Sequence, residues 1–168
     1  MAHQQGSKAN ADEISLRKLV RDFGAFADNG LFDQLGTLFA PEVRLDYSAL
    51  GAPAVQLSRE ALIGNWASLL PGFDLTLHDI DISDLTLTAD TARCEAALQA
   101  DHFVGAHYWQ LTGRYSFELR RTSVRWNIAC WEITALTLSL DGELGSREVL
   151  AAATANVSRR RSAESAAR

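Results

Sequence analysis

Apolar residues recur at helical spacing near the start of the chain. Between positions 12 and 28 they lie three or four residues apart, at Leu16, Leu19, Val20, Phe23 and Ala27. This spacing predicts an amphipathic helix, because residues three and four apart share one helix face. Asp12 fits the N-cap position, and the turn-forming sequence Asp28-Asn29-Gly30 predicts the end of the helix.

The next segment predicts two shorter helices with a strand between them. A helix over 31–39 ends before Ala40-Pro41, because the residue that precedes a proline disfavours the helical conformation. Apolar and polar residues then alternate through Tyr47, which is typical of a strand. Ser58 is a suitable N-cap for a helix that runs to Leu69.

Long stretches with strand character fill most of the second half of the chain. They cover residues 75–87, 91–104, 107–121 and 124–139. Turn-forming residues separate them at Ala89-Asp90, Gly105 and Thr122-Ser123. Consecutive long strands pair most simply as antiparallel hairpins. Helices followed by such a meander predict an α+β fold with the helices on one face of a curved, mostly antiparallel sheet.

The pattern predicts one domain with a tail at each end. Residues 1–11 are polar and without periodicity, which predicts a disordered tail. Residues 12–157 form the domain, and its last part, 146–157, has the pattern of a short helix. Residues 158–168 form a basic, solvated tail. A length of 168 residues fits this single-domain interpretation.

Composition and charge exclude several classes of protein. A hydrophobic fraction of 47% with 22% charged residues excludes collagen-like, disordered and coiled-coil chains. A net charge of −5 argues against binding to nucleic acid backbones. Two cysteines are too few for a disulfide framework. Because no apolar run resembles a signal peptide or reaches membrane-spanning length, we expect a cytoplasmic protein with no membrane partner.

Strand alternation predicts that two histidines point into the interior. His102 is in phase with Leu98 and Ala100, and His78 is in phase with Ile80 and Ile82. Tyr47, Trp109 and Tyr115 share the inner phase of their strands, and His107 is a further candidate. Small neighbours, among them Ala96 and Gly113, favour a cavity over a filled core. An apolar cavity with a few convergent polar groups is the default site for a small-molecule ligand.

Each of these residues also has a purely structural interpretation. A single inward histidine is more often a hydrogen-bonded core residue, and Asp28 can simply end its helix. A two-histidine, one-carboxylate metal set of His78, His102 and Asp28 lacks any supporting spacing. Cys94 lies among apolar residues, where a thiol is inert. Without a glycine-rich phosphate loop either, we expect no metal and no organic cofactor.

Three sequence stretches carry a resemblance to a known superfamily. They are FADNGLFDQLGTLFAPEVRLDY over 26–47, LTLHDIDI over 75–82 and ALQADHFVG over 97–105. In order and phase they resemble the nuclear transport factor 2-like, or SnoaL-like, superfamily, and within it scytalone dehydratase. The resemblance implies that superfamily's fold, a cone-shaped, mostly antiparallel sheet packed against N-terminal helices. The resemblance covers roughly residues 12–140. It assigns functional positions to Asp28, Tyr47, His78 and His102.

The chain also departs from that family in its pocket. Ala27 stands where scytalone dehydratase has a second pocket tyrosine, and Phe23 stands where bile-acid-type dehydratases have one. Gly113 and Tyr115 occupy the places of the family's serine and asparagine. We therefore expect a substrate other than scytalone, with Tyr115 as a candidate to supply the hydroxyl that Ala27 lacks.

The resemblance implies a cofactor-independent lyase that eliminates water, or a related leaving group, from an apolar hydroxy-carbonyl substrate. His102 is expected to be the acid/base group, with Asp28 fixing its tautomer. His78 is expected to hold the substrate oxygen and Tyr47 the developing enolate. Tyr115, Trp109 and Phe23 are expected to line the substrate site. The aromatic residues favour an aromatic or polycyclic substrate.

Two other classes of function remain open at this point. The same fold hosts isomerases and cyclases, and fold does not fix function. It also hosts non-catalytic ligand-binding and assembly modules, which would not need the chemistry of His78 and His102. The resemblance to scytalone dehydratase implies a homotrimer, and the dimers of related proteins are the alternative.

Overall fold

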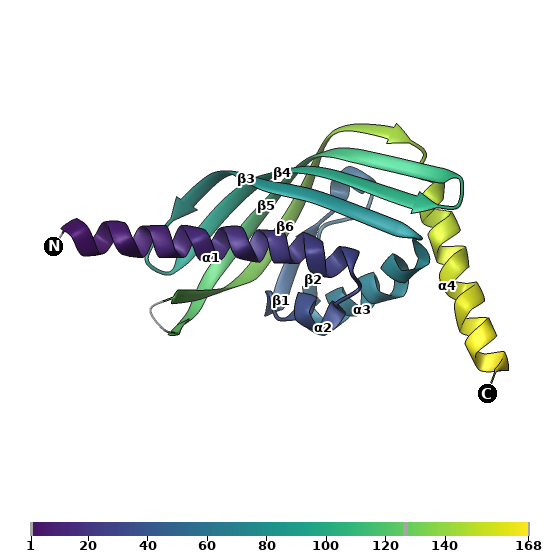
Figure 1. The fold of residues 1–168 in the computed structure, drawn as a ribbon, viewed down its shortest axis with the longest axis horizontal. Coiled ribbons are helices and arrows are strands. Elements are labelled where there is room, and N and C mark those ends of the chain that lie inside the picture. Colours follow the sequence, from purple (N-terminus) through teal and green to yellow (C-terminus); the bar gives the residue numbers. More distant parts are fainter. Residues whose placement is uncertain (1, 126–127, 168) are drawn as a thin grey trace.

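A single curved sheet with helices along its concave face forms the molecule (Figure 1). The computed structural model describes residues 2–125 and 128–167. Its α-helices are α1 (Ala2–Asp28), α2 (Phe32–Gly36), α3 (Arg59–Leu69) and α4 (Glu148–Ala166). Its strands are β1 (Phe39–Asp46), β2 (Val55–Ser58), β3 (Leu75–Leu87), β4 (Thr91–Val104), β5 (His107–Arg125) and β6 (Ile128–Gly145). Short 3₁₀ turns are η1 (Ser48–Leu50) and η2 (Leu70–Gly72).

The four long strands form the predicted antiparallel meander. The sheet order is β2-β1-β6-β5-β4-β3. Strands β3 and β4 match the predicted ranges 75–87 and 91–104. Strand β1 pairs in parallel with β6 and antiparallel with β2, so the early strand joins the far side of the same sheet. The predicted α+β fold with a curved, mostly antiparallel sheet is confirmed.

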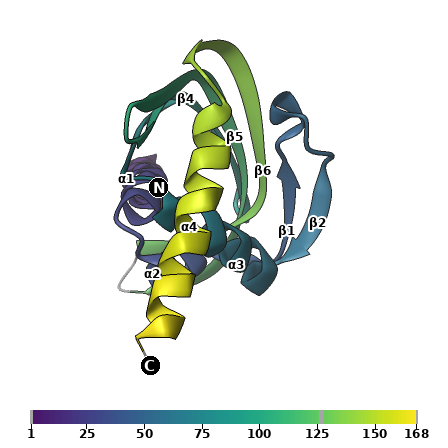
Figure 2. The ribbon, with the colours of Figure 1, turned by 90° about the vertical axis from the view of Figure 1, so that its right-hand side faces the viewer.

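Helices α1 and α4 cover different parts of the sheet. Helix α1 runs along the concave face and packs on β3 and β6. Helix α4 crosses the opposite end of the molecule, where it contacts η2, α3, β4 and β5 (Figure 2). Fully buried side chains fill the space between α1 and the middle of the sheet: Leu16, Val20, Leu35, Phe39, Phe117, Leu119, Ile133 and Leu136.

Both terminal segments continue helices instead of forming irregular tails. Helix α1 begins at Ala2, so the predicted N-cap residue Asp12 lies inside it. Helix α4 likewise runs from Glu148 to Ala166 and includes most of the basic segment. A helix that packing has already nucleated extends at little cost through residues such as Ala, Gln and Lys. Met1 and Arg168 lie outside the described residues, and the domain limits at 12 and 157 stay a prediction.

Two boundaries in the strand region were predicted wrongly. Thr122-Ser123 is not a turn, because β5 continues to Arg125 and an irregularity between Arg121 and Ser123 absorbs one residue. Strand β6 continues to Gly145, well past the predicted end at residue 139. The predicted helix 31–39 is shorter, since Phe39 already pairs with Ile133 of β6.

The described residues contain no helix that is both long and apolar enough to cross a membrane. Cys94 and Cys130 are free thiols. Burial raises the pKa of the Cys94 thiol to about 11, which keeps it protonated and unreactive.

Candidate active site

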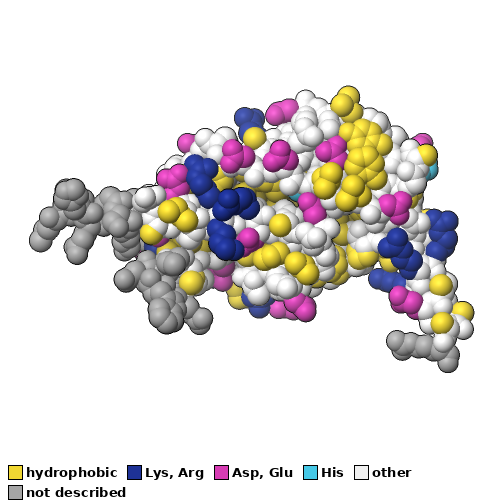
Figure 3. Space-filling view, viewed as in Figure 1, with side chains coloured by type: hydrophobic (Ala, Val, Ile, Leu, Met, Phe, Trp, Pro, Cys, Tyr) yellow, Lys and Arg dark blue, Asp and Glu magenta, His cyan; other side chains and the backbone are white. Residues whose placement is uncertain are grey.

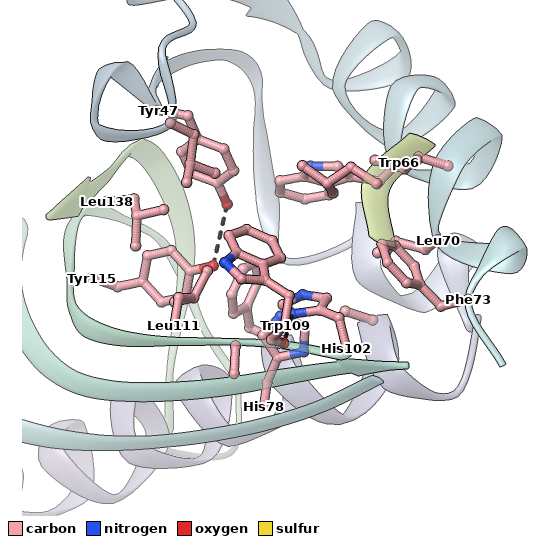
Figure 4. Close-up of a pocket in the computed structure, with 16 residues that line it drawn as sticks. Tyr47, Trp66, Leu70, Phe73, His78, His102, Trp109, Leu111, Tyr115 and Leu138 are labelled. Carbon is pink, nitrogen blue, oxygen red and sulfur yellow. Dashed lines mark hydrogen bonds between the residues drawn. The ribbon is translucent and has the colours of Figure 1, made fainter. Parts of the chain in front are cut away.

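A cavity of about 240 Å³ lies between the inner face of the sheet and the elements α3, η2 and α4 (Figure 4). Its wall is almost entirely apolar. Six of the predicted site residues line it: Phe23, Tyr47, His78, His102, Trp109 and Tyr115. The seventh, Asp28, lies behind His78 and outside the lining. Strand phase and helix spacing thus bring residues from α1, β3, β4 and β5 to one cavity.

Asp28 holds His78 at the edge of the cavity. One carboxylate oxygen of Asp28 lies 2.6 Å from His78 Nδ1, and the other accepts the backbone N–H of His78 at 2.8 Å. The Thr76 hydroxyl donates to the first oxygen at 2.8 Å. Gly24 permits this close approach of α1 to β3, because a Cβ there would lie 3.3 Å from His78 Cβ.

These contacts fix which nitrogen of His78 is available. Burial raises the pKa of Asp28, but the hydrogen bonds and charge of His78 outweigh it, and the net pKa is lowered. A carboxylate so close to Nδ1 requires that Nδ1 carries a proton and donates it. The ring therefore offers the lone pair of Nε2 to a ligand. This is an imidazole oriented by a carboxylate, the arrangement typical of a general base.

His102 is buried beside His78 but bonded differently. Its Nδ1 lies 3.3 Å from the backbone oxygen of Trp109, and its ring stacks on the Trp109 indole with centroids 4.8 Å apart. The two imidazoles meet edge to face at 5.7 Å. Burial, and then the neighbouring His78, lower the pKa of His102 to about 4. His102 is therefore neutral at pH 7 and contributes a polar, uncharged group to the cavity.

The predicted contact between Asp28 and His102 is wrong. Helix α1 lies over β3, so Asp28 reaches Thr76 and His78 on that strand. His102 is on the next strand, where it faces Thr76 across the ladder. The further candidate His107 is exposed at the start of β5 and takes no part in the cavity.

Two tyrosine hydroxyls meet at another part of the wall. Tyr47 Oη and Tyr115 Oη are 3.4 Å apart, a weak contact that leaves hydrogen-bonding capacity for a ligand. Burial raises the pKa of Tyr47 well above its ordinary value and that of Tyr115 to about 12. Both hydroxyls therefore stay protonated and can donate to an oxygen acceptor.

Several residues of the site were not predicted from the sequence, among them Thr76, Trp66 and Phe73. Thr76 is in the same strand phase as His78, so the alternation pattern contained the signal that it points inward. Trp66 on α3 and Phe73 after η2 line the cavity from outside the sheet. Strand phase carries no information about these two residues.

The described residues contain no group of three or more His, Cys, Asp or Glu side chains arranged to hold a metal ion. The donors considered for such a set have other partners, since Asp28 bonds His78 and His102 bonds the Trp109 carbonyl. No lysine or arginine side chain is among the residues that line the cavity, so nothing there would neutralise an anionic ligand.

Comparisons with known proteins agree with the fold. The family model of the SnoaL-like domain matches residues 9–132 of the chain. No curated protein sequence matches it. A solved structure with the same fold is that of the Kfla4162 protein from Kribbella flavida, at 21% identity and a TM-score of 0.73. That match covers 81% of this chain and 95% of the other.

Two further structures share the fold at lower identity. A provisionally named scytalone dehydratase from Novosphingobium aromaticivorans has 15% identity and a TM-score of 0.69, over 88% of this chain and 93% of that one. A type 2 hexachlorocyclohexane dehydrochlorinase, LinA, has 15% identity and a TM-score of 0.70, over 84% and 93%. At such identities the likeness shows a common architecture.

Proposed function

The chain belongs to the family of SnoaL-like domains, and from that premise we propose that it is a cofactor-independent lyase of the dehydratase type. The observation that carries the proposal is the 2.6 Å contact between Asp28 and His78 Nδ1 at the wall of an apolar cavity. A carboxylate-bound imidazole with a free Nε2 is suited to taking a proton from carbon near pH 7.

The proposed step is an elimination next to a carbonyl group. His78 Nε2 takes a proton from the α carbon, and the electrons of that C–H bond form the new double bond as the β C–O bond breaks. The imidazolium returns its proton to the departing hydroxyl, which leaves as water. Asp28 stabilises the imidazolium and keeps the ring in its tautomer. This assigns the base to His78 and not to His102.

The other polar groups of the cavity have complementary roles in this proposal. Tyr47 and Tyr115 donate hydrogen bonds to the carbonyl oxygen as it gains negative charge, the role of an oxyanion site. Neutral His102 binds the substrate hydroxyl. Trp109 and Phe23 provide the apolar wall. The absence of lysine and arginine from the lining favours an uncharged hydroxy-carbonyl substrate.

The names of two structural neighbours are consistent with this type of chemistry. A dehydratase removes water, and a dehydrochlorinase removes hydrogen chloride, so both names describe an elimination. An isomerase that moves the same proton is the second candidate, because the tyrosine hydroxyls would serve an enolate in that reaction too. For assembly we propose a homotrimer, with a homodimer as the alternative.

Turnover of a defined substrate panel tests the proposal. The panel consists of uncharged cyclic β-hydroxyketones with deuterium at the α carbon. We expect wild type to form the conjugated enone, seen by its absorbance, with loss of deuterium. His78→Asn should lower kcat by about 10²–10⁴, the usual effect of one general base. His107→Asn, an exposed histidine outside the cavity, is the matched control and should keep full activity.

Three results separate the candidate functions. Deuterium lost from the α carbon without release of water supports the isomerase. Binding of panel members without any change in them supports a ligand-binding module. Equal turnover by His78→Asn and wild type would contradict the assignment of the base.

A further inference from the structure

A β-bulge brings the side chain of Glu143 to the inner face of the sheet. From Leu136 to Leu140, alternate residues of β6 face inward, and Leu140 lies opposite Gly113. The register then shifts by one residue, since Thr112 pairs with Gly142 and Leu111 with Glu143. One inserted residue reverses which positions face inward. Glu143 consequently points toward the cavity end, and the apolar Leu144 is left 62% exposed.

Gly113 is the residue that makes room for this bulge. A Cβ at position 113 would lie 2.0 Å from the Ser139 backbone oxygen, a distance that no side chain tolerates. Bulges in sheets often lie beside functional sites, where they change the direction of a side chain. Here the redirected side chain is a partly exposed carboxylate, and its partner across the ladder, Leu111, lines the cavity.

Glu143 bonds a residue of the cavity wall. Its Oε1 accepts the indole N–H of Trp109 at 3.0 Å. Trp109 is only 2% exposed, and loss of this bond would leave its N–H without a protein partner. Both Glu143 oxygens also bind the Arg147 guanidinium, at 2.6 and 2.9 Å. Arg147 is the residue immediately before α4, and Leu150 of α4 lines the cavity.

Trp109 in turn determines the surroundings of His102. The indole stacks on the imidazole at an interplanar angle of 28°, and the Trp109 carbonyl is the partner of His102 Nδ1. A rotation of the indole would therefore uncover the His102 ring. No other contact of the described residues fixes the indole through its N–H.

We propose that Glu143 is a positioning residue of the site, which holds the Trp109 indole against His102 and so orients His102 toward the substrate. The importance of His102 for the reaction rests on the proposed function. The contacts from Glu143 to His102 are independent of it, and they link the imidazole to the start of the helix that closes the cavity.

The test is a titration of the full-length protein without ligand, with ¹⁵N-labelled histidine followed by NMR. Glu143→Ala should release the indole and admit water to His102. The pKa of His102 should then rise by about 1 unit or more from its depressed value toward 6.5. The share of the Nδ1–H tautomer should fall. Loss of a nearby anion alone would lower the pKa, so a rise reports repositioning.

Three further variants make the result specific. Glu143→Gln keeps an acceptor for the indole N–H and removes only the charge, so the pKa of His102 should not rise. Trp109→Phe keeps an aromatic ring and the backbone carbonyl but removes the N–H, so it should give the same change at His102 as Glu143→Ala. It also serves as the test if Glu143→Ala does not fold. Arg147→Ala leaves the bond between Glu143 and Trp109 and should leave His102 unchanged. The other charged or titratable groups near His102 are His78, Asp28 and Asp101, which all variants retain.

Unchanged pKa and tautomer of His102 in both Glu143→Ala and Trp109→Phe would overturn the proposal. An equal shift in Glu143→Gln and Glu143→Ala would overturn it as well, because the hydrogen bond would then not be the cause. No substrate enters this measurement, so failure of the lyase proposal leaves its result intact. Conversely, Glu143→Ala could show a normal kcat together with a raised pKa of His102. That result would count against a role of His102 in the reaction and not against the positioning of His102 by Glu143.

Discussion

Helix α1 contains two aspartates, Asp12 and Asp28, that bind residues of the sheet at two separate places, and their partners differ in what they leave available. Asp12 binds Arg121 through two hydrogen bonds, at 3.1 and 2.7 Å. Arg121 is also bonded to the Ala89 carbonyl and lies over the Trp131 ring at 4.4 Å. Asp28 binds His78, but the imidazole keeps Nε2 free at the cavity.

The difference between the two ends lies in the space around the partner. At the Asp12 end both carboxylate oxygens accept hydrogen bonds from the Arg121 guanidinium, so the two charged groups of the pair bind each other. At the Asp28 end small residues and aromatic walls leave a cavity, and none of the described residues forms a hydrogen bond with His78 Nε2. A binding or catalytic site needs polar atoms that are available to a ligand, whereas a pair that only stabilises the fold does not. We therefore assign the Asp12 end to stability and the Asp28 end to function.

The outer face of the molecule shows the same α1 with ordinary surface charges (Figure 3). Arginine and lysine side chains gather beside acidic ones over this helix. One ion pair on the helix is formed by Lys18 and Asp22. Such exposed pairs contribute little to stability. They provide a matched control for the buried pair at Asp12.

The largest expected effect is the loss of the Asp12 pair. Asp12→Asn leaves the Arg121 charge, whose side chain is 12% exposed, without its carboxylate. The free energy of unfolding should fall by about 3 to 5 kcal/mol, as for other buried pairs that lose one partner. Asp22→Asn should change it by less than about 0.5 kcal/mol. Urea unfolding measures both; similar losses in the two variants would remove the distinction between the buried and the exposed pair.

The next effect is a pH dependence that originates at the cavity end. Unfolded His102 takes up a proton near its ordinary pKa of 6.5, and the folded protein only near 4. The unfolded state therefore binds more protons in this window, and stability falls as the pH drops from 6.5 to 4, by up to about 3 kcal/mol. Asp28 changes the stability only at lower pH, because the fold lowers its pKa from the ordinary value of 3.8.

His102→Leu isolates this contribution. The difference in stability between the variant and wild type should grow in favour of the variant as the pH falls through that window. Urea unfolding at pH 7, 5.5 and 4 measures it. A difference that stays constant over the three pH values would mean that His102 is not held neutral by the fold.

The smallest effect on stability is expected at the tyrosine pair. Tyr115→Phe removes a hydroxyl whose contact with Tyr47 is 3.4 Å long, so the free energy of unfolding should change by less than about 1 kcal/mol. Turnover of a carbonyl substrate should fall by about 10²–10³, the effect of losing one oxyanion-site donor. Unaltered kcat with a substrate that wild type converts would exclude Tyr115 from the oxyanion site.

Most of the fold, and six of the residues that line the cavity, could be predicted from the sequence. Alternation was regular over residues 75–82 of β3, along β4 and over residues 107–120 of β5, so the inward direction of His78, His102 and Tyr115 could be predicted. Helical spacing likewise located Asp28 at the end of α1. These features depend on local periodicity, which is the strongest signal in a single sequence.

What could not be predicted depends on contacts between distant segments. Which histidine Asp28 reaches is decided by the packing of α1 on β3, and no local pattern records it. Glu143 was missed because a bulge reverses the alternation of β6, and regular alternation would have buried Leu144 in its place. The parallel pairing of β1 with β6 joins segments about ninety residues apart and is equally invisible to periodicity.

Urea unfolding of His102→Leu at pH 7 tests most directly whether the buried His102 imidazole is held for function and not for stability. At this pH both side chains are uncharged, and the single bond lost is the 3.3 Å contact to the Trp109 carbonyl. We predict that the variant is as stable as wild type or more stable, because leucine suits the apolar wall. A loss of about 2 kcal/mol or more, typical of a broken buried hydrogen bond, would contradict this and make His102 a structural residue.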